Sequence, residues 1–427
     1  MGNKEALGIL KEQIKTISPS KEETIAIDKK AAELIEFLRK NIKKSKISAE
    51  IFVGGSSARG TLIKKSKYDI DVFVRFNAKK YKSEGISSLL ERIVPKNSRK
   101  IHGSRDYFSL KSENQPIEIE IIPVLKITRP EQAENITDLS YFHVNYVKNK
   151  IKKNKKLADE IRLAKAFAYY QDCYGAESYI NGFSGYAIEL LVVYYKSFVN
   201  FIEAISKADI MKGKIIIDIE KKFKNKEDIT RQLNESKLQS PIVLIDPTYK
   251  ERNALAALSY ETFLKFRAAC RNFLKQPGSR FFEFGDKQKD LEKKYGKSLI
   301  KLELSTEKQA GDIAGTKLKK FSGFFIAEIE KYFDVKDSEF DYDEDANIGK
   351  IFLAAEPKKE IVFPGPPAGM KKALAAFRKQ HKKIKIIRGK AFAYEKNKLD
   401  FKKFLNKFMN NKSKIIEDMG VNGLGLV

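Results

Sequence analysis

Two short stretches decide the fold of the N-terminal part of this chain: Gly54-Gly55-Ser56-Ser57-Ala58-Arg59-Gly60-Thr61 and, shortly after it, Asp69-Ile70-Asp71-Val72-Phe73. The first follows Ile51-Phe52-Val53, an apolar run typical of a strand, and its glycines and serines predict a turn. The second alternates acidic and apolar residues with the period of a strand. Segments 5–16 and 21–45 precede them with helical spacing, so an α+β domain is expected.

The two aspartates of the second stretch form a candidate metal site. Asp69 and Asp71 are expected on one side of their strand, while Ile70 and Val72 point into a core. Adjacent carboxylates repel each other, which opposes folding. A pair of Mg²⁺ ions would remove that repulsion, and Mg²⁺ prefers hard oxygen ligands.

A later strand repeats the pattern. In Ile117-Glu118-Ile119-Glu120-Ile121-Ile122-Pro123 the isoleucines at positions 117, 119 and 121 line one face and both glutamates point the other way. For either strand alone, the alternative is a half-exposed strand with its acids in solvent. The Gly-Gly-Ser turn upstream favours a functional site, because exposed backbone N–H groups and a hydroxyl suit a triphosphate.

Composition indicates a multidomain protein with an anionic partner. A chain of 427 residues exceeds the size at which one core keeps growing, so about three domains are expected. The 83 Lys and Arg against 56 Asp and Glu give a net charge of +27, which favours nucleic acid as a partner. The alternative is a lysine-rich proteome in which every protein is basic.

Cysteine content and hydropathy predict a cytoplasmic protein that does not associate with membranes. Cys173 and Cys270 are far apart and lack CxxC spacing, which supports neither a zinc site nor a disulfide framework. No stretch approaches the ~18 apolar residues of a membrane span. The MGN start lacks the Ser or Thr of a myristoylation site, since Ala6 stands there, and no anchor is expected.

Periodicity divides the rest of the chain into a helical middle and a second α+β region, with expected domain boundaries at 1–138, 139–275 and 276–427. In the middle domain, helices are expected at 158–170, 185–204 and 260–274. In the last domain, strands are expected at 299–304, 351–355, 384–387 and 390–394, and helices at 324–333, 368–379 and 400–410.

The order of glycine-serine turn, DxD pair and later strand acid resembles the signature of the DNA polymerase β superfamily of nucleotidyltransferases. The resemblance implies that Gly55, Ser56 and Arg59 contact a triphosphate. It also implies that Asp69, Asp71 and Glu120 are catalytic residues that hold two metal ions, expected to be Mg²⁺. The third acid is usually Asp, so Glu120 departs from the pattern by one methylene. Glu118 points the same way and is the alternative ligand.

Several further segments narrow this resemblance to the archaeal CCA-adding enzymes, the class I tRNA nucleotidyltransferases. In chain order they are Leu163–Phe167, Tyr174–Tyr179, Gly182–Tyr186, Asp246-Pro247, Arg252–Ala254 and Gly420-Val421.

This resemblance implies nucleotide-binding roles for residues of the middle domain. His143, Lys165 and Tyr174 would contact the incoming triphosphate, since imidazole, ammonium and phenol groups all donate hydrogen bonds. Arg252 would help to select cytosine and adenine through its planar fork. Taken singly, these residues have other interpretations: a packed histidine, a solvated lysine and an exposed arginine at a helix start.

The same resemblance implies that the last domain is a body and tail that grip the acceptor stem and the TΨC arm of tRNA. Lysine and arginine runs suited to phosphate contacts occur at Lys371-Lys372, Arg378-Lys379 and Lys382–Lys385. The 317–320 segment, Lys-Leu-Lys-Lys, lacks the more distinctive motif of relatives. The oligomeric state stays open, with a homodimer among the alternatives.

The function expected from the sequence is untemplated addition of C, C and A to the tRNA 3′ end from CTP and ATP, in tRNA processing and repair. The alternatives are a poly(A)- or oligonucleotide-type polymerase of the same superfamily and a non-catalytic RNA-binding protein. Three acids on two strands beside an intact glycine turn argue against the latter.

Overall fold

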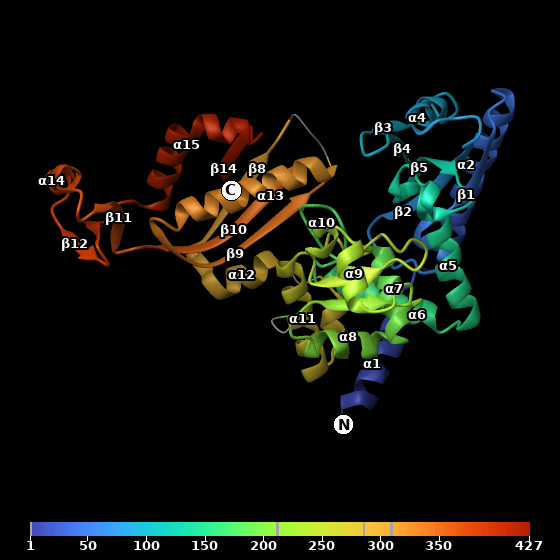
Figure 1. Ribbon diagram of the computed structural model, residues 1–427, viewed down its shortest axis with the longest axis horizontal. Helices are drawn as coiled ribbons and strands as arrows, with labels where there is room; N and C mark the ends of the chain where they lie inside the picture. Colours follow the sequence, from blue (N-terminus) through green and yellow to red (C-terminus); the bar gives the residue numbers. More distant parts are fainter. Residues whose placement is uncertain (1, 211–212, 285–286, 308–310, 345) are drawn as a thin grey trace. The chain divides into compact units, whose positions relative to one another are not determined.

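The computed structural model describes residues 2–210, 213–284, 287–307, 311–344 and 346–427. The chain divides into two compact units (Figure 1). The first contains Met1–Ala176 and Ile180–Phe284, and the second contains Glu177–Tyr179 and Gly285–Val427. The three expected domains, with boundaries near 138 and 275, stay a prediction.

The first unit begins with two helices and a five-stranded sheet. The helices are α1 (Gly2–Ile17) and α2 (Lys21–Lys44), and Ser20 and Glu23 form a capping box at the start of α2. The sheet has the order β1-β2-β5-β4-β3. Its strands are β1 (Ala49–Val53), β2 (Tyr68–Asn77), β3 (Arg99–Ile101), β4 (Tyr107–Lys111) and β5 (Ile117–Lys126).

One face of this sheet is apolar and the other carries the acids. Ile70 and Val72 of β2 lie in a core with residues of α2 and of α4 (Ser83–Glu91). Strands β2 and β5 run parallel, and the other pairings within the sheet are antiparallel. The period of two predicted from the sequence is thus confirmed.

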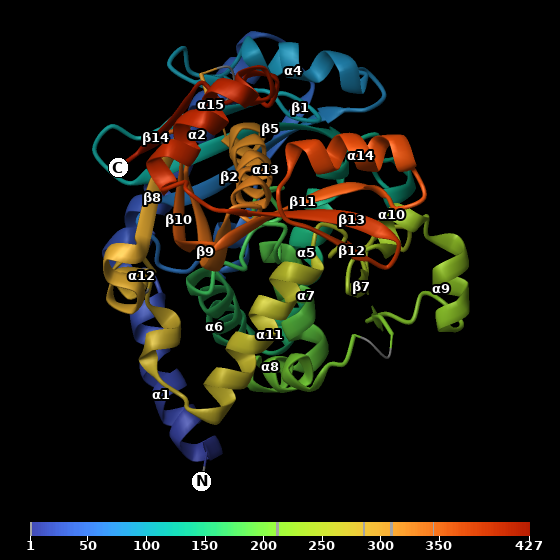
Figure 2. The same cartoon turned by 90° about the vertical axis from the view of Figure 1, so that its left-hand side faces the viewer.

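Helices form the rest of the first unit around a phenylalanine-rich core. Phe167 has Phe198, Phe266 and Phe273 within 6 Å, measured between ring centroids. Figure 2 shows α6, α7, α8 and α11 gathered in this layer. The helices are α5 (Ser140–Lys153), α6 (Leu157–Tyr170), α7 (Gly185–Tyr195), α8 (Phe198–Lys207), α9 (Lys226–Gln232), α10 (Glu235–Leu238) and α11 (Tyr260–Lys275), with short 3-10 turns η1 (Pro130–Gln132), η2 (Ile136–Leu139) and η3 (Ser279–Phe282).

Two features of this layer differ from the sequence expectation. The helix expected at 185–204 is two helices, because Lys196 adopts a left-handed conformation with φ of 74° and Ser197 caps α8 by accepting from the Asn200 backbone N–H. A short parallel pair, β6 (Ile215–Asp218) and β7 (Ile242–Ile245), was not expected. Strand β7 is buried at every position and therefore lacks the alternation that marks a strand.

The second unit contains two further sheets. A four-stranded sheet has the order β14-β8-β10-β9, and its core includes Phe321 and Phe325 of α13 and Phe404 and Phe408 of α15. A three-stranded sheet has the order β11-β13-β12, and α14 packs against β11 (Figure 2). The strands are β8 (Leu299–Ser305), β9 (Phe333–Asp343), β10 (Ile348–Pro357), β11 (Glu360–Pro367), β12 (Ile384–Ile387), β13 (Lys390–Lys396) and β14 (Gly423–Leu426).

The helices of the second unit correct another expectation. They are α12 (Lys287–Tyr295), the 3-10 turn η4 (Gly296–Ser298), α13 (Gly311–Ile329), α14 (Lys371–Gln380) and α15 (Phe401–Asp418). The helix expected at 324–333 is wrong in its bounds, because α13 ends at Ile329 and Phe333 already begins β9. Apolar residues continue across this boundary, so the helical spacing does not reveal where the strand starts.

Candidate active site

The glycine turn is built against the strand that carries the aspartates. The Gly54 N–H donates to the Asp71 carbonyl over 2.8 Å, and the short helix α3 (Gly55–Arg59) follows. Gly55 has φ of +58°, and a Cβ built there would lie 1.7 Å from Asp71 Oδ2. A Cβ at Gly54 would lie 2.2 Å from the Phe73 ring. Both glycines are therefore required for the turn to approach the carboxylate.

The pairing of β2 with β5 brings the acids of the two strands together. Asp69 is in register with Glu118, and Asp71 is in register with Glu120. Because side chains at paired positions of parallel strands point to the same face, all four acids share one surface. Sequence periodicity predicts which side chains of each strand share a face, but it does not predict the register between the two strands.

Glu118 and Glu120 have different environments. Glu118 is bound by the Lys67 ammonium and the Ser109 hydroxyl. Burial opposes its ionisation, but the hydrogen bonds from Lys67 and Ser109 outweigh burial and lower the pKa of Glu118. Burial, reinforced by the negative charges of Asp71 and Asp69, raises the pKa of Glu120 to about 8. The Lys67 ammonium therefore already balances the charge of Glu118, whereas Glu120 faces the negative charges of Asp71 and Asp69.

Asp71 and Glu120 lie in a region of excess negative charge. Burial raises the pKa of Asp71 to about 6, and Asp69 adds to this effect, while Arg59 and Lys165 oppose it. Asp69 is half exposed, and its Oδ2 lies 3.8 Å from Lys65 Nζ. In the described part of the chain, no three His, Cys, Asp or Glu side chains already stand in a metal-binding arrangement.

The donor set nevertheless fits a divalent cation. Carboxylate oxygens are the ligands that Mg²⁺ prefers, and a cation beside Asp71 and Glu120 would offset the burial and the mutual repulsion that raise both pKa values. The Asp69 side chain has the freedom to turn toward such an ion, because 53% of it is exposed. These three acids are the residues that could hold metal.

Glu189 of α7 contacts Arg59 and Lys165, two of the cationic residues that are expected to bind the triphosphate. Its carboxylate lies 2.8 Å from Arg59 Nε and 2.7 Å from Lys165 Nζ, and it accepts from the Thr61 hydroxyl over 2.7 Å. Glu189 is fully buried, and Lys165 is 1% exposed. The interpretation of Lys165 as a solvated lysine is therefore wrong. Burial lowers the pKa of Lys165 to about 8, although Glu189 opposes that shift.

Tyr174 stands beside this cluster. A Cβ built at Gly185 would lie 2.6 Å from the Tyr174 hydroxyl oxygen and 3.7 Å from Lys165 Cε, so the tyrosine and the lysine are neighbours. Lys65 Nζ lies 5.2 Å from the centroids of the Tyr174 and Tyr169 rings. Ser56 lies within α3, and its carbonyl accepts from the Thr61 N–H over 3.0 Å. The structure thus brings Ser56, Arg59, Lys165 and Tyr174 around the glycine turn, whereas His143 contacts a different carboxylate.

His143 and Arg252 meet at a second buried carboxylate, Asp246, which follows β7. His143 Nε2 and Arg252 Nη1 lie 2.9 Å and 2.8 Å from Asp246 Oδ2. The His143 ring stacks on Tyr186 with centroids 4.1 Å apart. The histidine is therefore packed between Tyr186 and the Asp246 carboxylate, and Arg252 is anchored at one end of its fork.

Sequence reasoning missed Glu189, Asp246 and Tyr186. Glu189 is the single acid in the apolar run 187–193, a position where a buried charge needs a cationic partner, and that signal could have found it. Asp246 precedes Pro247 in a segment that was noticed only for its resemblance. No sequence signal points to the stacking of Tyr186 on His143.

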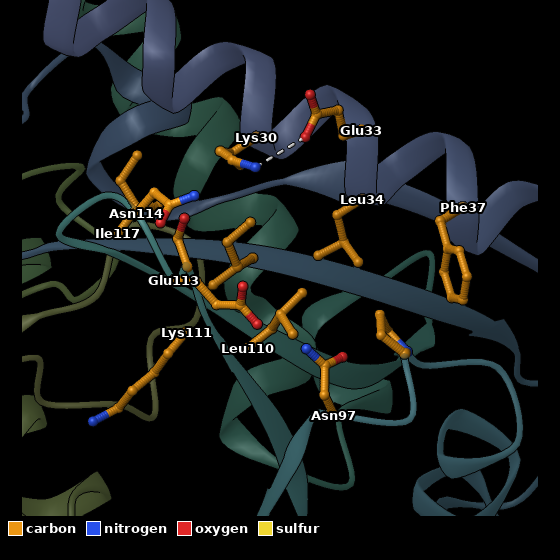
Figure 3. Close-up of a pocket in the computed structure, with 13 residues that line it drawn as sticks. Lys30, Glu33, Leu34, Phe37, Asn97, Leu110, Lys111, Glu113, Asn114 and Ile117 are labelled. Carbon is orange, nitrogen blue, oxygen red and sulfur yellow. Dashed lines mark hydrogen bonds and ion pairs between the residues drawn. The ribbon is translucent and has the colours of Figure 1, made fainter.

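A pocket of about 370 Å³ lies on the other face of the sheet (Figure 3). Leu34 and Phe37 of α2 face Leu110 and Ile117 across it, and Lys30 and Glu33 bond to each other at its rim. Ile117 and Ile119 belong to the apolar face, so the β sheet separates this pocket from the acids. None of the residues expected at the active site lines it.

Two family models match the chain. Residues 159–283 match the second domain of tRNA nucleotidyltransferases. Residues 7–153 match the Second Messenger Oligonucleotide or Dinucleotide Synthetase domain. Among the described residues, no helix is both long and apolar enough for a membrane crossing.

Solved structures show the same fold in RNA-modifying enzymes. The Cid1 poly(U) polymerase bound to MgATP aligns with a TM-score of 0.51 at 14% identity, covering 65% of this chain and 98% of that one. A cytoplasmic RNA terminal U-transferase aligns with a TM-score of 0.50 at 15% identity, covering 66% and 99%. The expected nucleotidyltransferase fold of the α+β class is thereby confirmed.

Curated relatives are more similar and match most of the chain. The CCA-adding enzyme of Nanoarchaeum equitans is 34% identical over 361 residues, which are 84% of this chain and 86% of the relative. The CCA-adding enzyme of Methanocaldococcus jannaschii is 31% identical over 399 residues, 90% of this chain and 86% of the relative. The CCA-adding enzyme of Saccharolobus shibatae is 30% identical, with 82% and 81% covered. This chain belongs to the family of CCA-adding enzymes, which are tRNA nucleotidyltransferases.

Proposed function

We propose that this protein adds C, C and A to the 3′ end of tRNA, using CTP and ATP and no nucleic-acid template. One observation carries the proposal: Asp71 and Glu120 stand in register on neighbouring strands, directly beside the positive-φ turn at Gly55. Carboxylates that share a face next to open backbone N–H groups suit a metal-bound triphosphate.

Asp69, Asp71 and Glu120 would hold two Mg²⁺ ions. Bound there, the ions would activate the terminal hydroxyl of the tRNA and neutralise the departing pyrophosphate. Glu118 takes no part, because Lys67 and Ser109 already occupy its carboxylate. The longer Glu120 side chain supplies the third oxygen ligand in place of the usual aspartate.

The remaining polar residues would bind the nucleotide. The backbone at Gly55 and the Ser56 hydroxyl donate to the triphosphate, and Arg59, Lys165 and Tyr174 add donors from one side. Arg59 and Lys165 are held by Glu189, so their charges are in place before the nucleotide arrives. Such preorganised donors act without reorganising at the moment of reaction.

His143 and Arg252 would contact the sugar or base of the nucleotide. Arg252 keeps part of its guanidinium available, since Nη1 is the end bonded to Asp246 and 22% of the side chain is exposed. A guanidinium N–H can donate to the ring nitrogen that is an acceptor in both cytosine and adenine and that carries a proton in uracil and guanine.

The second unit would bind the acceptor stem and the TΨC arm of the tRNA. Its basic side chains on α14, on β12 and on the segment between them are exposed, as phosphate contacts require. They are Lys371, Lys372, Arg378, Lys379, Lys382, Lys383 and Lys385. In this proposal residues 1–138 catalyse, 139–275 bind the nucleotide and 276–427 bind the tRNA.

The test is transfer of single labelled nucleotides to a tRNA transcript that lacks its CCA end. With Mg²⁺, CTP should be incorporated first, ATP should be incorporated only after two cytidines, and UTP and GTP should be poor substrates. Asp71→Asn should lose transfer but retain tRNA binding. Long tails of A or U on the same transcript would instead indicate a poly(A)- or poly(U)-type polymerase.

A further inference from the structure

We propose that Asp246 is a positioning residue that orients Arg252 and fixes the tautomer of His143, and that base discrimination depends on this arrangement. The inference rests on the proposed function, in which both residues face the nucleotide. It assigns a role to a residue that itself stands behind the site, fully buried at the end of β7.

The contacts of Asp246 leave its carboxylate little freedom. Oδ1 accepts from the Thr248 hydroxyl over 2.7 Å, from the Thr248 N–H over 2.8 Å and from the Tyr186 hydroxyl over 3.1 Å. Oδ2 accepts from Arg252 Nη1 over 2.8 Å and lies 2.9 Å from His143 Nε2. The Asp246 N–H also donates to the Arg252 carbonyl over 2.9 Å. Three donors to Oδ1, of which the Thr248 hydroxyl is only one, therefore hold the carboxylate in the orientation that positions the other two side chains.

The orientation of Arg252 follows from two of these contacts. Its backbone is tied to Asp246 through the carbonyl, and its side chain is tied through Nη1. The guanidinium carbon also lies 5.7 Å from the centroid of the Tyr186 ring. A planar fork fixed at one end points its remaining donors in one direction. Without Asp246 the fork would rotate freely.

The tautomer of His143 follows from the chemistry of an ionised carboxylate. Burial opposes the ionisation of Asp246, but the neighbouring His143, the charge of Arg252 and the hydrogen bond from Thr248 hold its pKa well below the ordinary value. A carboxylate oxygen has no proton to donate and would repel a bare nitrogen lone pair at 2.9 Å, so we place the proton of His143 on Nε2. Burial is the largest influence on His143 and lowers its pKa, so the ring is neutral at neutral pH. Its Nδ1 is then an acceptor.

This arrangement changes the partner expected for His143. A neutral ring with a bare Nδ1 cannot donate to a phosphate oxygen, so the triphosphate contact implied by the family resemblance does not follow. The matching group is a hydrogen-bond donor on the nucleotide, either a ribose hydroxyl or the amino group of cytosine or adenine. Asp246 thus sets one acceptor, on His143, and one oriented donor, on Arg252.

The tautomer can be measured directly, because the chain contains three histidines. We would label the full-length protein with ¹⁵N-histidine and assign His143 with the variants His102→Gln and His381→Gln, which leave it untouched. The expected result is a neutral His143 with its proton on Nε2. A neutral ring protonated on Nδ1, or a charged ring at neutral pH, would overturn the proposal without requiring any variant at Asp246.

Two variants connect the geometry to selectivity. Asp246→Asn should mix the His143 tautomers and reduce the CTP-to-UTP ratio of kcat/KM by at least about tenfold, since the orienting charge is lost. Thr248→Val is the matched control: it removes one bond to Oδ1, keeps Oδ2 intact, and should change the ratio less than about threefold. A purely structural role would lower CTP and UTP use together and leave their ratio unchanged.

Further arms separate the remaining outcomes. If Asp246→Asn does not fold, Arg252→Lys is the substitute test, because it keeps the charge but loses the fork. It should also reduce the CTP-to-UTP ratio of kcat/KM, and an unchanged ratio would overturn the proposal. For the wild-type protein, kcat/KM with 2′-deoxy-CTP and with UTP would each be compared with that for CTP. A larger loss with 2′-deoxy-CTP would identify the ribose hydroxyl as the donor to His143, and a larger loss with UTP would identify the amino group. A wild-type protein that transfers neither C nor A refutes the proposed function, whereas the tautomer still reports on Asp246.

Discussion

Replacing Glu189 with glutamine should destabilise the protein more than any exposed charge replacement. The substitution keeps the shape of the side chain and removes its charge. Arg59 and Lys165 then remain beside each other without a counterion, in a site where Glu189 is fully buried and Lys165 is 1% exposed. The Arg59 side chain is 9% exposed, so water cannot take over the role of the carboxylate.

The expected magnitude follows from burial. Removing one partner of a buried ion pair costs about 3–5 kcal/mol. The lower end applies here, because burial already lowers the pKa of Lys165 to about 8, and without Glu189 the lysine can release its proton. We therefore expect a loss of about 3 kcal/mol, which for a unit of this size lowers the midpoint of thermal unfolding by roughly 6 °C.

The assay is thermal and urea unfolding followed by circular dichroism. Lys165→Met combined with Glu189→Gln should recover at least about 1 kcal/mol relative to the sum of the single variants, because the two residues interact directly. Glu203→Gln is the control, since Glu203 and Lys207 form an exposed pair at 3.9 Å, and it should change stability by less than about 0.5 kcal/mol. Equal effects of Glu189→Gln and Glu203→Gln would refute the reasoning.

Four further predictions follow from the site. Folding raises the pKa of Asp71 from 3.8 to about 6, so the metal-free protein loses stability as the pH rises through that interval. Asp71→Asn should remove this loss and be more stable than wild type at pH 7.5, by about 3 kcal/mol in pH-dependent urea unfolding. Gly55→Ala should abolish transfer and cost about 1–3 kcal/mol, since its φ is +58°, whereas Gly85→Ala, with open space around it, should be neutral in both assays. In single-turnover CTP addition, Glu120→Gln should be far slower than Glu118→Gln, and equal losses would place the metal at Glu118 instead. Affinity for tRNA should fall steeply with salt in filter binding, and a slope near zero would exclude phosphate contacts as its source.

Local patterns in the sequence were sufficient to predict the acid-bearing strands and the turn. The alternation from Asp69 to Phe73 and from Ile117 to Pro123 is local, because strand periodicity depends on neighbouring residues alone. The glycine turn is local for the same reason. The parallel register that brings Asp71 next to Glu120 depends on how the chain crosses over from one strand to the other, and no local pattern encodes that path.

Tertiary burial accounts for most of what sequence reasoning missed. Lys165 has the helical spacing of a surface residue, yet tertiary packing places it against Glu189, a residue one helix away. The break at Lys196 interrupts an apolar pattern that continues on both sides, and Ser197 as a helix cap was its only local sign. Buried β7 lacks alternation, so its role in presenting Asp246 was equally invisible.

The most direct test of the central claim is sequencing of the 3′ ends that the purified protein makes on one tRNA presented in three forms. These forms end before the CCA, after the first C and after the second C, and all four nucleoside triphosphates are supplied together with Mg²⁺. Each form should be completed to CCA and then extended no further, and Asp71→Asn should leave all three unchanged. Homopolymeric tails, or extension that continues past the terminal A, would contradict it.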